Sequence, residues 1–319
     1  VDVQSGGKIV TVGLGWKAKN GPCPGATSST KGGGGGYGGK GGTSTVSKLG
    51  CSVPYGNASA PVNFGSGGGY TGGPGGGIIF INATNNVTIN GNLNSSGSSG
   101  GVSASGGGAG GSIWIISSNF SGLGTLNAIG GNSYYYSGYH GGGGSGGRIA
   151  VSQDESYFNG GILLAGGNGV SNGFAGTYSF PEGNNLTVNS DMALAPGNYT
   201  IPYLNVTNSA TLEVQGDNST TNGFGVVITG VNVNIDEGST ISGNSLGFLP
   251  YRGPGKGGGT STKGGGASHG GYGGNHSSGG GGNMVPYGSE KYPIELGSGG
   301  GYSGLQGTAG GGAIELNMS

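Results

Sequence analysis

The sequence predicts an all-β protein, and more specifically a β-solenoid of the right-handed parallel β-helix type with ordered glycine-rich tracts. Three observations support this fold class. Short apolar runs of near-constant length recur along the chain, glycine-rich turns separate them at regular intervals, and the whole pattern begins again after about 232 residues. No stretch has the 3.6-residue apolar period of an amphipathic helix.

Glycine-rich turns precede the first set of predicted strands. GGPGGG leads into Ile78–Ile81, GGAGG into Ile113–Ile116 and GGSGG into Ile149–Val151, at a spacing of about 35 residues. A second strand then closes each unit, at Thr125–Ile129 and Ile162–Ala165. Such short apolar runs bounded by turn signals are typical of buried strands. Backbone ladders between successive coils would then stabilise the fold more than a wide apolar core does.

Period-2 alternation replaces the glycine-rich pattern from Leu186 onward. It predicts strands with one buried face at Leu186–Val188, Leu204–Val206, Leu212–Val214 and Val231–Ile235. A sandwich built from the strands between Leu186 and Ser242 is the alternative for this part of the chain.

Glycine accounts for 88 of the 319 residues, and charged residues for only 7%, against about 25% in an ordinary domain. Each glycine in regular structure costs about 0.5–1 kcal/mol relative to alanine, so this composition needs a structural reason. A disordered low-complexity segment is the alternative. Collagen is excluded, because glycine does not recur at every third residue.

Two glycine tracts, Gly32–Gly42 and Gly257–Gly282, are interpreted as polyglycine-II-like. Extended threefold glycine helices can pack backbone against backbone and share amide hydrogen bonds. On this hypothesis, tyrosine side chains within or beside the tracts lie on flat backbone surfaces. These are Tyr37, Tyr70, Tyr272 and Tyr302.

The internal repeat aligns the end of the chain with its beginning. Val1-Asp2-Val3 matches Val233-Asn234-Ile235, the VPYG motif at Val53 recurs at Val285, and GSGGGY at Gly65 recurs at Gly297. The chain therefore divides into one full repeat, 1–232, and the start of another, 233–319. Within the first repeat we distinguish a glycine-rich segment with two cysteines (1–64), glycine-rich β-coils (65–180) and alternating strands (181–232). An enzyme with a duplicated accessory region is the competing interpretation.

Charge and hydropathy exclude two classes of partner. A net charge of -1 and a pI near 6.3 give no basic surface for nucleic acid. The longest apolar runs are four residues, far short of the roughly 20 that a membrane-spanning helix needs. The sequence shows neither an initiator methionine nor a signal peptide, so we expect a mature product or a piece of something longer.

Eleven Asn-x-Ser/Thr sequons predict N-glycans on outward faces, although about half of them would be expected from composition alone. Asparagine and serine serving turns are the plainer explanation for any one site. Charged residues are too few to make the surface polar, and a coat of glycans would supply that polarity. The sequons are at Asn57, Asn82, Asn86, Asn94, Asn119, Asn185, Asn198, Asn205, Asn218, Asn275 and Asn317.

The two cysteines, Cys23 and Cys51, flank the first glycine tract and are predicted to form a disulfide. The repeat replaces them with Gly255 and Asn283, so both are lost together where one alone would leave an unpaired thiol. Two independent thiols are the alternative. A disulfide worth about 3 kcal/mol and a glycan coat both indicate the secretory route and an extracellular location.

The sequence offers little for catalysis, and we expect no cofactor, no metal site and no enzymatic activity. His140, His269 and His276 lie in glycine-rich stretches without carboxylates at metal-ligand spacing. Asp154-Glu155 and Asp236-Glu237 are the only adjacent acidic pairs. Paired carboxylates that meet only in space remain open, with few acids available to form them.

The units GGGAGGSIWII from Gly106 and GGGGSGGRIAV from Gly141 resemble the glycine-rich β-helical repeats of large extracellular proteins of plants and protists. The resemblance covers Gly65–Gly176 and the matching end of the second copy, and it is compositional. It implies a surface or matrix location and no catalytic residues.

These observations together predict a structural protein of a glycosylated extracellular fibre or surface coat, with other copies of itself as partner. A surface adhesin or carbohydrate-binding module is the alternative, with Tyr134, Tyr135, Tyr136 and Tyr139 as a sugar-stacking patch. A remoter alternative is ice binding, suggested by flat glycine-rich faces and the Thr-Ser-Thr strings at Thr43–Thr45 and Thr260–Thr262.

Overall fold

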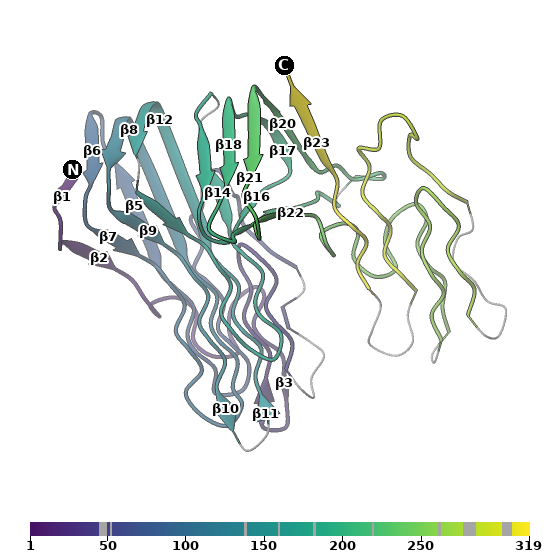
Figure 1. Ribbon diagram of the computed structural model, residues 1–319. Helices are drawn as coiled ribbons and strands as arrows, with labels where there is room; N and C mark the ends of the chain where they lie inside the picture. Colours follow the sequence, from purple (N-terminus) through teal and green to yellow (C-terminus); the bar gives the residue numbers. More distant parts are fainter. Residues whose placement is uncertain are drawn as a thin grey trace. The chain divides into compact units, whose positions relative to one another are not determined.

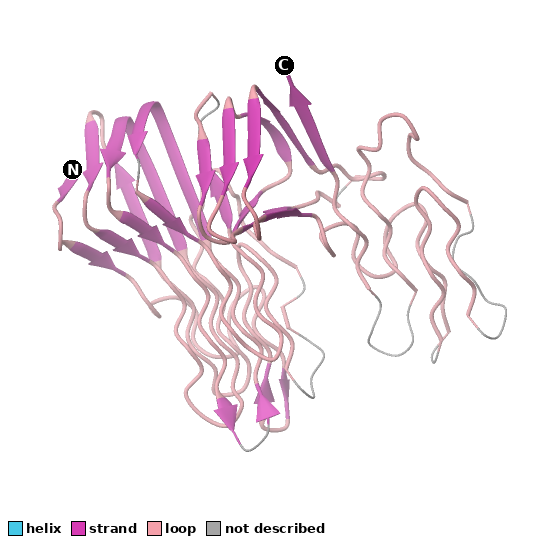
Figure 2. Ribbon diagram, in the orientation of Figure 1, coloured by secondary structure: helices cyan, strands magenta, loops and turns pink. Residues whose placement is uncertain are grey.

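The computed structural model (Figure 1) describes residues 1–44, 50–51, 53–136, 139–158, 160–180, 183–218, 220–260, 263–276, 285–301 and 308–319. Within these ranges the protein is all-β, with mostly parallel strands and no helix (Figure 2). Two compact units divide the chain. The first comprises 1–184, 188–193 and 207–210, and the second comprises 185–187, 194–206 and 211–319.

Parallel strands of the first unit pair in register within their sheets. Ile79, Ile113 and Ile149 are successive partners on β5, β8 and β12, and Leu93, Leu126 and Ile162 on β7, β9 and β13. All six side chains are buried. The strands of this unit are β1 (Asp2–Val3), β2 (Lys8–Val10), β3 (Thr27–Ser28), β4 (Lys31–Gly32), β5 (Ile78–Asn82), β6 (Asn86–Ile89), β7 (Asn92–Asn94), β8 (Ser112–Gly122), β9 (Thr125–Asn127), β10 (Tyr135–Tyr136), β11 (Tyr139–His140), β12 (Arg148–Phe158), β13 (Gly161–Leu163) and β14 (Thr177–Ser179).

The strands of the second unit also pair in parallel, as β17–β20–β23, β18–β21 and β19–β22. Parallel ladders are typical of stacked coils and not of a hairpin-built sandwich, so the sandwich alternative for Leu186–Ser242 is not what the structure shows. These strands are β17 (Gly197–Thr200), β18 (Tyr203–Val206), β19 (Thr211–Val214), β20 (Val226–Gly230), β21 (Asn232–Ile235), β22 (Thr240–Ser242) and β23 (Ile314–Met318); β15 (Leu186–Val188) and β16 (Met192–Leu194) contain residues of both units.

Glycine-rich connections of the first unit run side by side as undulating segments without strand symbols (Figures 1 and 2). Backbone hydrogen bonds join them laterally in an unbroken series. The amide of Gly167 donates to Gly144, Gly144 to Gly131, Gly131 to Gly108, Gly108 to Ser98 and Ser98 to Pro74, over 2.7–3.0 Å. We call this array of connections, drawn from 32–44, 65–76, 95–111, 128–136, 139–147 and 164–176, the glycine layer.

The first glycine tract is part of this layer and forms backbone hydrogen bonds with several of its other segments. Gly35 donates to Gly107, Gly107 to Gly142 and Gly142 to Gly32, each at 3.0 Å. Gly32–Gly39 are buried. Their polar backbone groups are therefore paired with other backbone, as burial requires, and the tract is ordered structure. The tract is therefore not the disordered low-complexity segment that the sequence left as an alternative.

Side chains are excluded from the glycine layer by the distance between its segments. A Cβ on Gly144 would lie 2.0 Å from the carbonyl oxygen of Gly108, and one on Gly108 would lie 2.1 Å from that of Pro74. Contacts below 3.0 Å against backbone can be relieved only by moving whole segments apart. The high glycine content is thus required by the packing.

Replacing Gly144 with alanine should therefore lower the free energy of unfolding by about 3 kcal/mol, the upper part of the range for overpacking a close-packed interior. Gly101→Ala is the matched control, because Gly101 is exposed and a Cβ there meets nothing within 4 Å. It should change stability by less than about 0.5 kcal/mol. Urea unfolding of both variants checks this, and equal effects would contradict the steric explanation.

Candidate functional site

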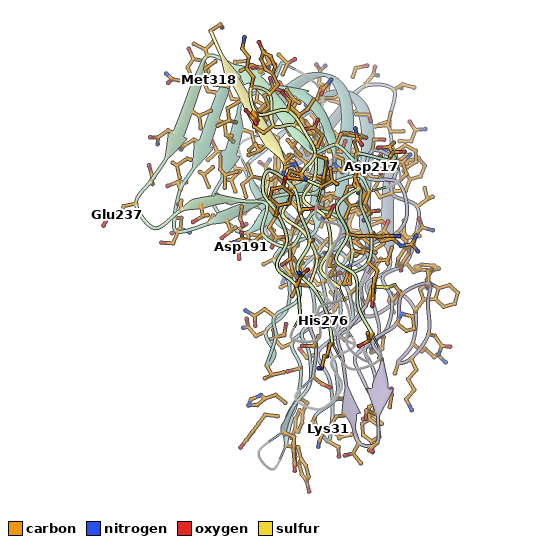
Figure 3. All side chains as sticks on the ribbon, turned by 90° about the vertical axis from the view of Figure 1, so that its right-hand side faces the viewer. Lys31, Asp191, Asp217, Glu237, His276 and Met318 are labelled. Carbon is orange, nitrogen blue, oxygen red and sulfur yellow. A yellow bond between two sulfur atoms is a disulfide. The ribbon has the colours of Figure 1, made fainter. Side chains whose placement is uncertain are left out.

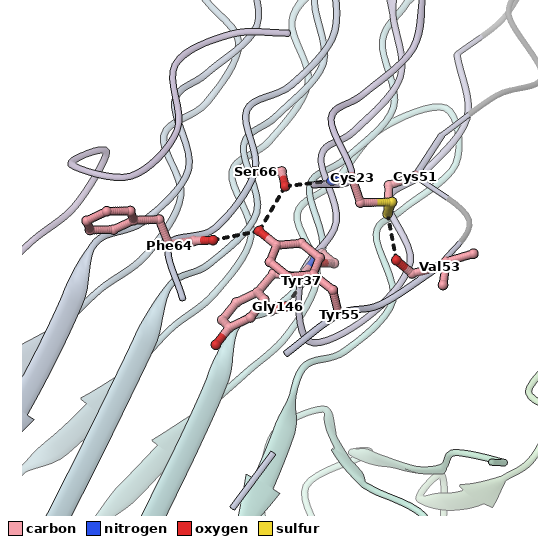
Figure 4. The surroundings of a disulfide bond; sticks show 9 residues. Cys23, Tyr37, Cys51, Val53, Tyr55, Phe64, Ser66 and Gly146 are labelled. Atoms are coloured by element: carbon pink, nitrogen blue, oxygen red, sulfur yellow. Dashed lines mark hydrogen bonds between the residues drawn. A yellow bond between two sulfur atoms is a disulfide. The ribbon is translucent and has the colours of Figure 1, made fainter. Parts of the chain in front are cut away.

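The disulfide anchors the segment that carries the first glycine tract. Cys23 and Cys51 are bonded, with 28 residues of sequence separation (Figure 4). Beside the disulfide, the Cys23 amide donates to Ser66 Oγ at 3.2 Å, and the Tyr55 hydroxyl meets the same oxygen at 2.9 Å while donating to the Phe64 carbonyl at 2.6 Å. The loop is thus fixed both covalently and through Ser66.

Tyr37, at the centre of the tract, is fully buried. Its hydroxyl lies 2.7 Å from Ser112 Oγ at the start of β8, and its amide donates to Ser145 Oγ at 2.9 Å. Its ring packs against that of Tyr55, with centroids 4.9 Å apart. Tyr37 was predicted only to lie on backbone surfaces. In the structure its side chain also connects the glycine layer to strand β8.

Arg148, the first residue of β12, is buried beside these tyrosines. Its Nε donates to the Tyr55 carbonyl at 3.0 Å, its Nη1 donates to Thr177 Oγ1 at 2.7 Å, and its guanidinium lies 5.4 Å from the Tyr37 ring centroid. Burial raises the pKa of Tyr37 and Tyr55 and lowers the pKa of Arg148. These groups form a polar junction between the layer and the strands.

The second copy of the repeat rebuilds half of this junction. His269 aligns with Tyr37 and Tyr287 with Tyr55; their rings are 4.8 Å apart, and the Tyr287 amide donates to the His269 carbonyl as the Tyr55 amide does to that of Tyr37. Tyr287 also reaches Ser298 Oγ at 2.8 Å. The recurrence marks the junction as part of the repeat's architecture.

His269 differs from Tyr37 in lacking a partner for the end of its ring. Nε2 is buried without a hydrogen bond among the described residues, beside a cavity of about 470 Å³ lined in part by Tyr287 and Glu290. In the first copy the corresponding hydroxyl meets Ser112 of the following coil.

Sequence reasoning missed this junction. Arg148 appeared only within the motif GGRIAV, and Tyr55 only within VPYG. The available signal was the recurrence of VPYG and GSGGGY at one offset, which aligns Tyr55 with Tyr287 and Ser66 with Ser298.

None of the eleven sequon asparagines is buried. Asn94, Asn119 and Asn205 are half-buried and the other eight are exposed. Asn82 ends β5 and Asn86 begins β6, and both are exposed as predicted for one outward face. Asn119 Nδ2 donates to Asn86 Oδ1 at 2.9 Å, so asparagines of neighbouring coils also form side-chain ladders.

The four predicted patch tyrosines gather at the tip of the glycine layer. Tyr134, Tyr135, Tyr136 and Tyr139 are 41–58% exposed, around the antiparallel pair β10–β11 (Figure 1). The Lys31 Nζ lies 3.3 Å from the Tyr139 ring centroid, and Lys31 is at this tip in Figure 3. The structure thus brings these tyrosines together and leaves them accessible.

Other sequence predictions fall in different places. Tyr70 is half-buried, whereas Tyr272 is 76% exposed. Tyr302, Asn283 and the tract beyond residue 276 lie outside the described residues, as do Thr45, Ser261 and Thr262 of the Thr-Ser-Thr strings. The side chains of Asp154 and Glu155 are not described either, and Asp236 and Glu237 are exposed after β21.

Within the described ranges, no three His, Cys, Asp or Glu residues are grouped as a metal ion would need. In the same part of the chain no helix has the length and apolarity to cross a membrane. No protein family, curated protein or solved structure matches the sequence or the fold.

Buried tyrosines should make stability fall at high pH. Burial raises the pKa of Tyr199, whose hydroxyl donates to the Ala195 carbonyl, to about 12. An unfolded tyrosine ionises near pH 10, so the contribution of Tyr199 is complete below pH 10 and is lost between pH 10 and 12. In this pH window the ionisation of Tyr199 in the unfolded chain makes the unfolding free energy fall as pH rises. Tyr199→Phe removes this contribution, so the fall should become less steep by about 1.4 kcal/mol per pH unit.

Urea unfolding at pH 9, 10 and 11 measures this difference in slope. Tyr136→Phe, on the exposed strand β10, is the matched control. An equal change of slope in the two variants would rule out burial as the cause.

Proposed function

We propose that the chain is a non-catalytic structural protein of a glycosylated extracellular fibre or surface coat, and that it assembles with other copies of itself. On this proposal the coils form a right-handed parallel β-helix, and the glycine layer is a polyglycine-II-like lattice. The observation that carries the proposal is the stacking of parallel coils in register, with the same strands recurring at both ends of the described chain. Parallel coils can add without limit, because each coil contacts only its neighbours.

Two further features support an extracellular setting. The Cys23–Cys51 disulfide is of the kind that persists in oxidising compartments. All eleven sequon asparagines have some exposure to solvent. Glycans there would cover a surface that has few charged groups.

Electron microscopy of the native material tests the fibre. We expect filaments whose axial repeat matches one 232-residue unit, and mass spectrometry of glycosidase-treated and untreated protein should show occupied sequons on the outward faces. Discrete monomers at all concentrations would refute the fibre.

A carbohydrate-binding adhesin is the second candidate, and the exposed tyrosines at the β10–β11 tip favour it. Aromatic rings on accessible loops stack on sugar faces, and Tyr135 and Tyr136 are more than half exposed. We expect Tyr135→Ala with Tyr136→Ala to abolish any binding on a glycan array. Exposed Tyr203→Ala is the control, and binding unaffected by the double substitution would contradict this function.

A further inference from the structure

The net charge of -1 conceals two stretches of opposite charge. Residues 3–153 contain six Lys, one Arg and no acidic residue, whereas residues 154–319 contain eleven acidic residues and four Lys or Arg. All segments of the glycine layer except 164–176 belong to the positive stretch. A region of one charge sign raises the local concentration of oppositely charged ligands, whatever the net charge of the whole chain. We therefore expect the glycine layer to attract anions.

Two lysines at and near the tip of the layer lie against aromatic rings. The Lys31 Nζ is 3.3 Å from the Tyr139 ring centroid, and the Lys19 Nζ is 5.6 Å from that of Tyr70. The Tyr70 amide donates to Thr27 Oγ1 at 2.7 Å on β3, which pairs with β4, the strand of Lys31. An aromatic face attracts an ammonium group but supplies no full counter-charge. In the described part of the chain Lys31 has no carboxylate partner.

The exposed tyrosines lie beside Lys31. The Gly142 amide donates to the Gly32 carbonyl at 3.0 Å, which brings β11 next to β4. In the pair β10–β11, Tyr135 is opposite His140, and their ring centroids are 4.4 Å apart. Figure 1 shows β10 and β11 at the end of the layer, near β3. The tip thus combines an aromatic surface with a positive charge at its margin.

Neighbouring turns flank the tyrosine hairpin on both sides, so its exposure is a property of the layer itself. The Gly100 amide donates to the Asn132 carbonyl at 2.8 Å, and the Ser133 amide donates to the Asn168 carbonyl at 2.7 Å. The four tyrosine side chains are 41–58% exposed with both flanking turns present.

The composition of these turns favours an anionic sugar over a neutral one. Residues 27–32, 99–105, 132–141 and 168–172 contain no Asp or Glu. These turns therefore supply no carboxylate to accept hydrogen bonds from sugar hydroxyl groups. An ammonium group beside the rings instead forms a charge-assisted hydrogen bond with a carboxylate or sulfate, which is about twice as strong as a neutral one.

We propose that the tip of the glycine layer binds an anionic polysaccharide, one that carries carboxylate or sulfate groups. The rings of Tyr135 and Tyr136 stack on the C–H faces of its sugars, and Lys31 binds an anionic group beside them. Lys19 adds a second cation near the same hairpin. This inference rests on the carbohydrate-binding function proposed above and names the class of sugar.

Polymers that differ in charge test the proposal with the full chain. Biolayer interferometry compares polygalacturonate with its methyl ester, and dextran sulfate with dextran. We expect the charged member of at least one pair to bind at least tenfold more tightly than its neutral counterpart, and this preference to fall as the NaCl concentration is raised. The pair that shows the preference distinguishes a carboxylate ligand from a sulfate ligand.

Matched substitutions locate the binding. Lys31→Gln should weaken binding of the charged polymer at least fivefold, whereas Lys31→Arg should preserve it because arginine keeps the charge. Tyr135→Ala with Tyr136→Ala should abolish it. Lys8→Gln is the control, because Lys8 on β2 is exposed and its loss removes the same charge from residues 3–153. It should change the affinity by less than twofold, and thermal unfolding checks that each variant is folded.

The other outcomes would overturn the proposal in different ways. Equal affinity for charged and neutral polymers would overturn the anionic preference and leave the carbohydrate-binding function standing. Equal weakening by Lys31→Gln and Lys8→Gln would show a general attraction of polyanions to the positive stretch, without a site at the tip. An oligonucleotide that binds more tightly than every polysaccharide would show a nucleic-acid site. A chain that binds no polymer and no glycan on an array would overturn both this inference and the carbohydrate-binding function.

Discussion

The close approach of backbone to backbone in the glycine layer is the constraint on which the other features depend. Its segments lie so near one another that a Cβ on Gly144 would overlap the Gly108 carbonyl, and many of its amides donate to carbonyls of neighbouring segments. Stability therefore depends on paired polar backbone groups in a buried interior, where leaving them unpaired would be costly. This accounts for a chain with 88 glycines and few charges.

The strand stack sets the register for the layer. Ile79, Ile113 and Ile149 align across three parallel strands, so the glycine-rich connections that lead into these strands end at matching heights and can bond laterally. Tyr37, Tyr55 and Arg148 fix the junction between the two parts. Arg148 is buried there with hydrogen bonds to Tyr55 and Thr177, and removing its partners would leave a buried charge unsatisfied.

Strand positions and the repeat could be predicted from the sequence because both are local or periodic signals. Ile78–Ile81 and Leu204–Val206 carry their own alternation and turn punctuation, and the structure has strands there. The junction could not be predicted, because Tyr37 meets Ser112 across 75 residues and Arg148 meets Tyr55 across 93. The exposed position of Tyr272 could not be predicted either, because a glycine-rich neighbourhood does not reveal which segments lie beside it.

The two copies of the repeat differ in how far their aligned glycines are buried. Gly32, Gly34, Gly39 and Gly42 are buried, whereas the aligned Gly264, Gly266, Gly271 and Gly274 are exposed. The first set bonds to segments such as 106–107 and 142–143, and the described residues of the second copy include no equivalent of those segments. Isolated polyglycine has no side chains to bury and loses much backbone entropy on ordering. In the first copy, hydrogen bonds to laterally neighbouring segments offset this loss of entropy, so each glycine segment is stabilised by the segments beside it.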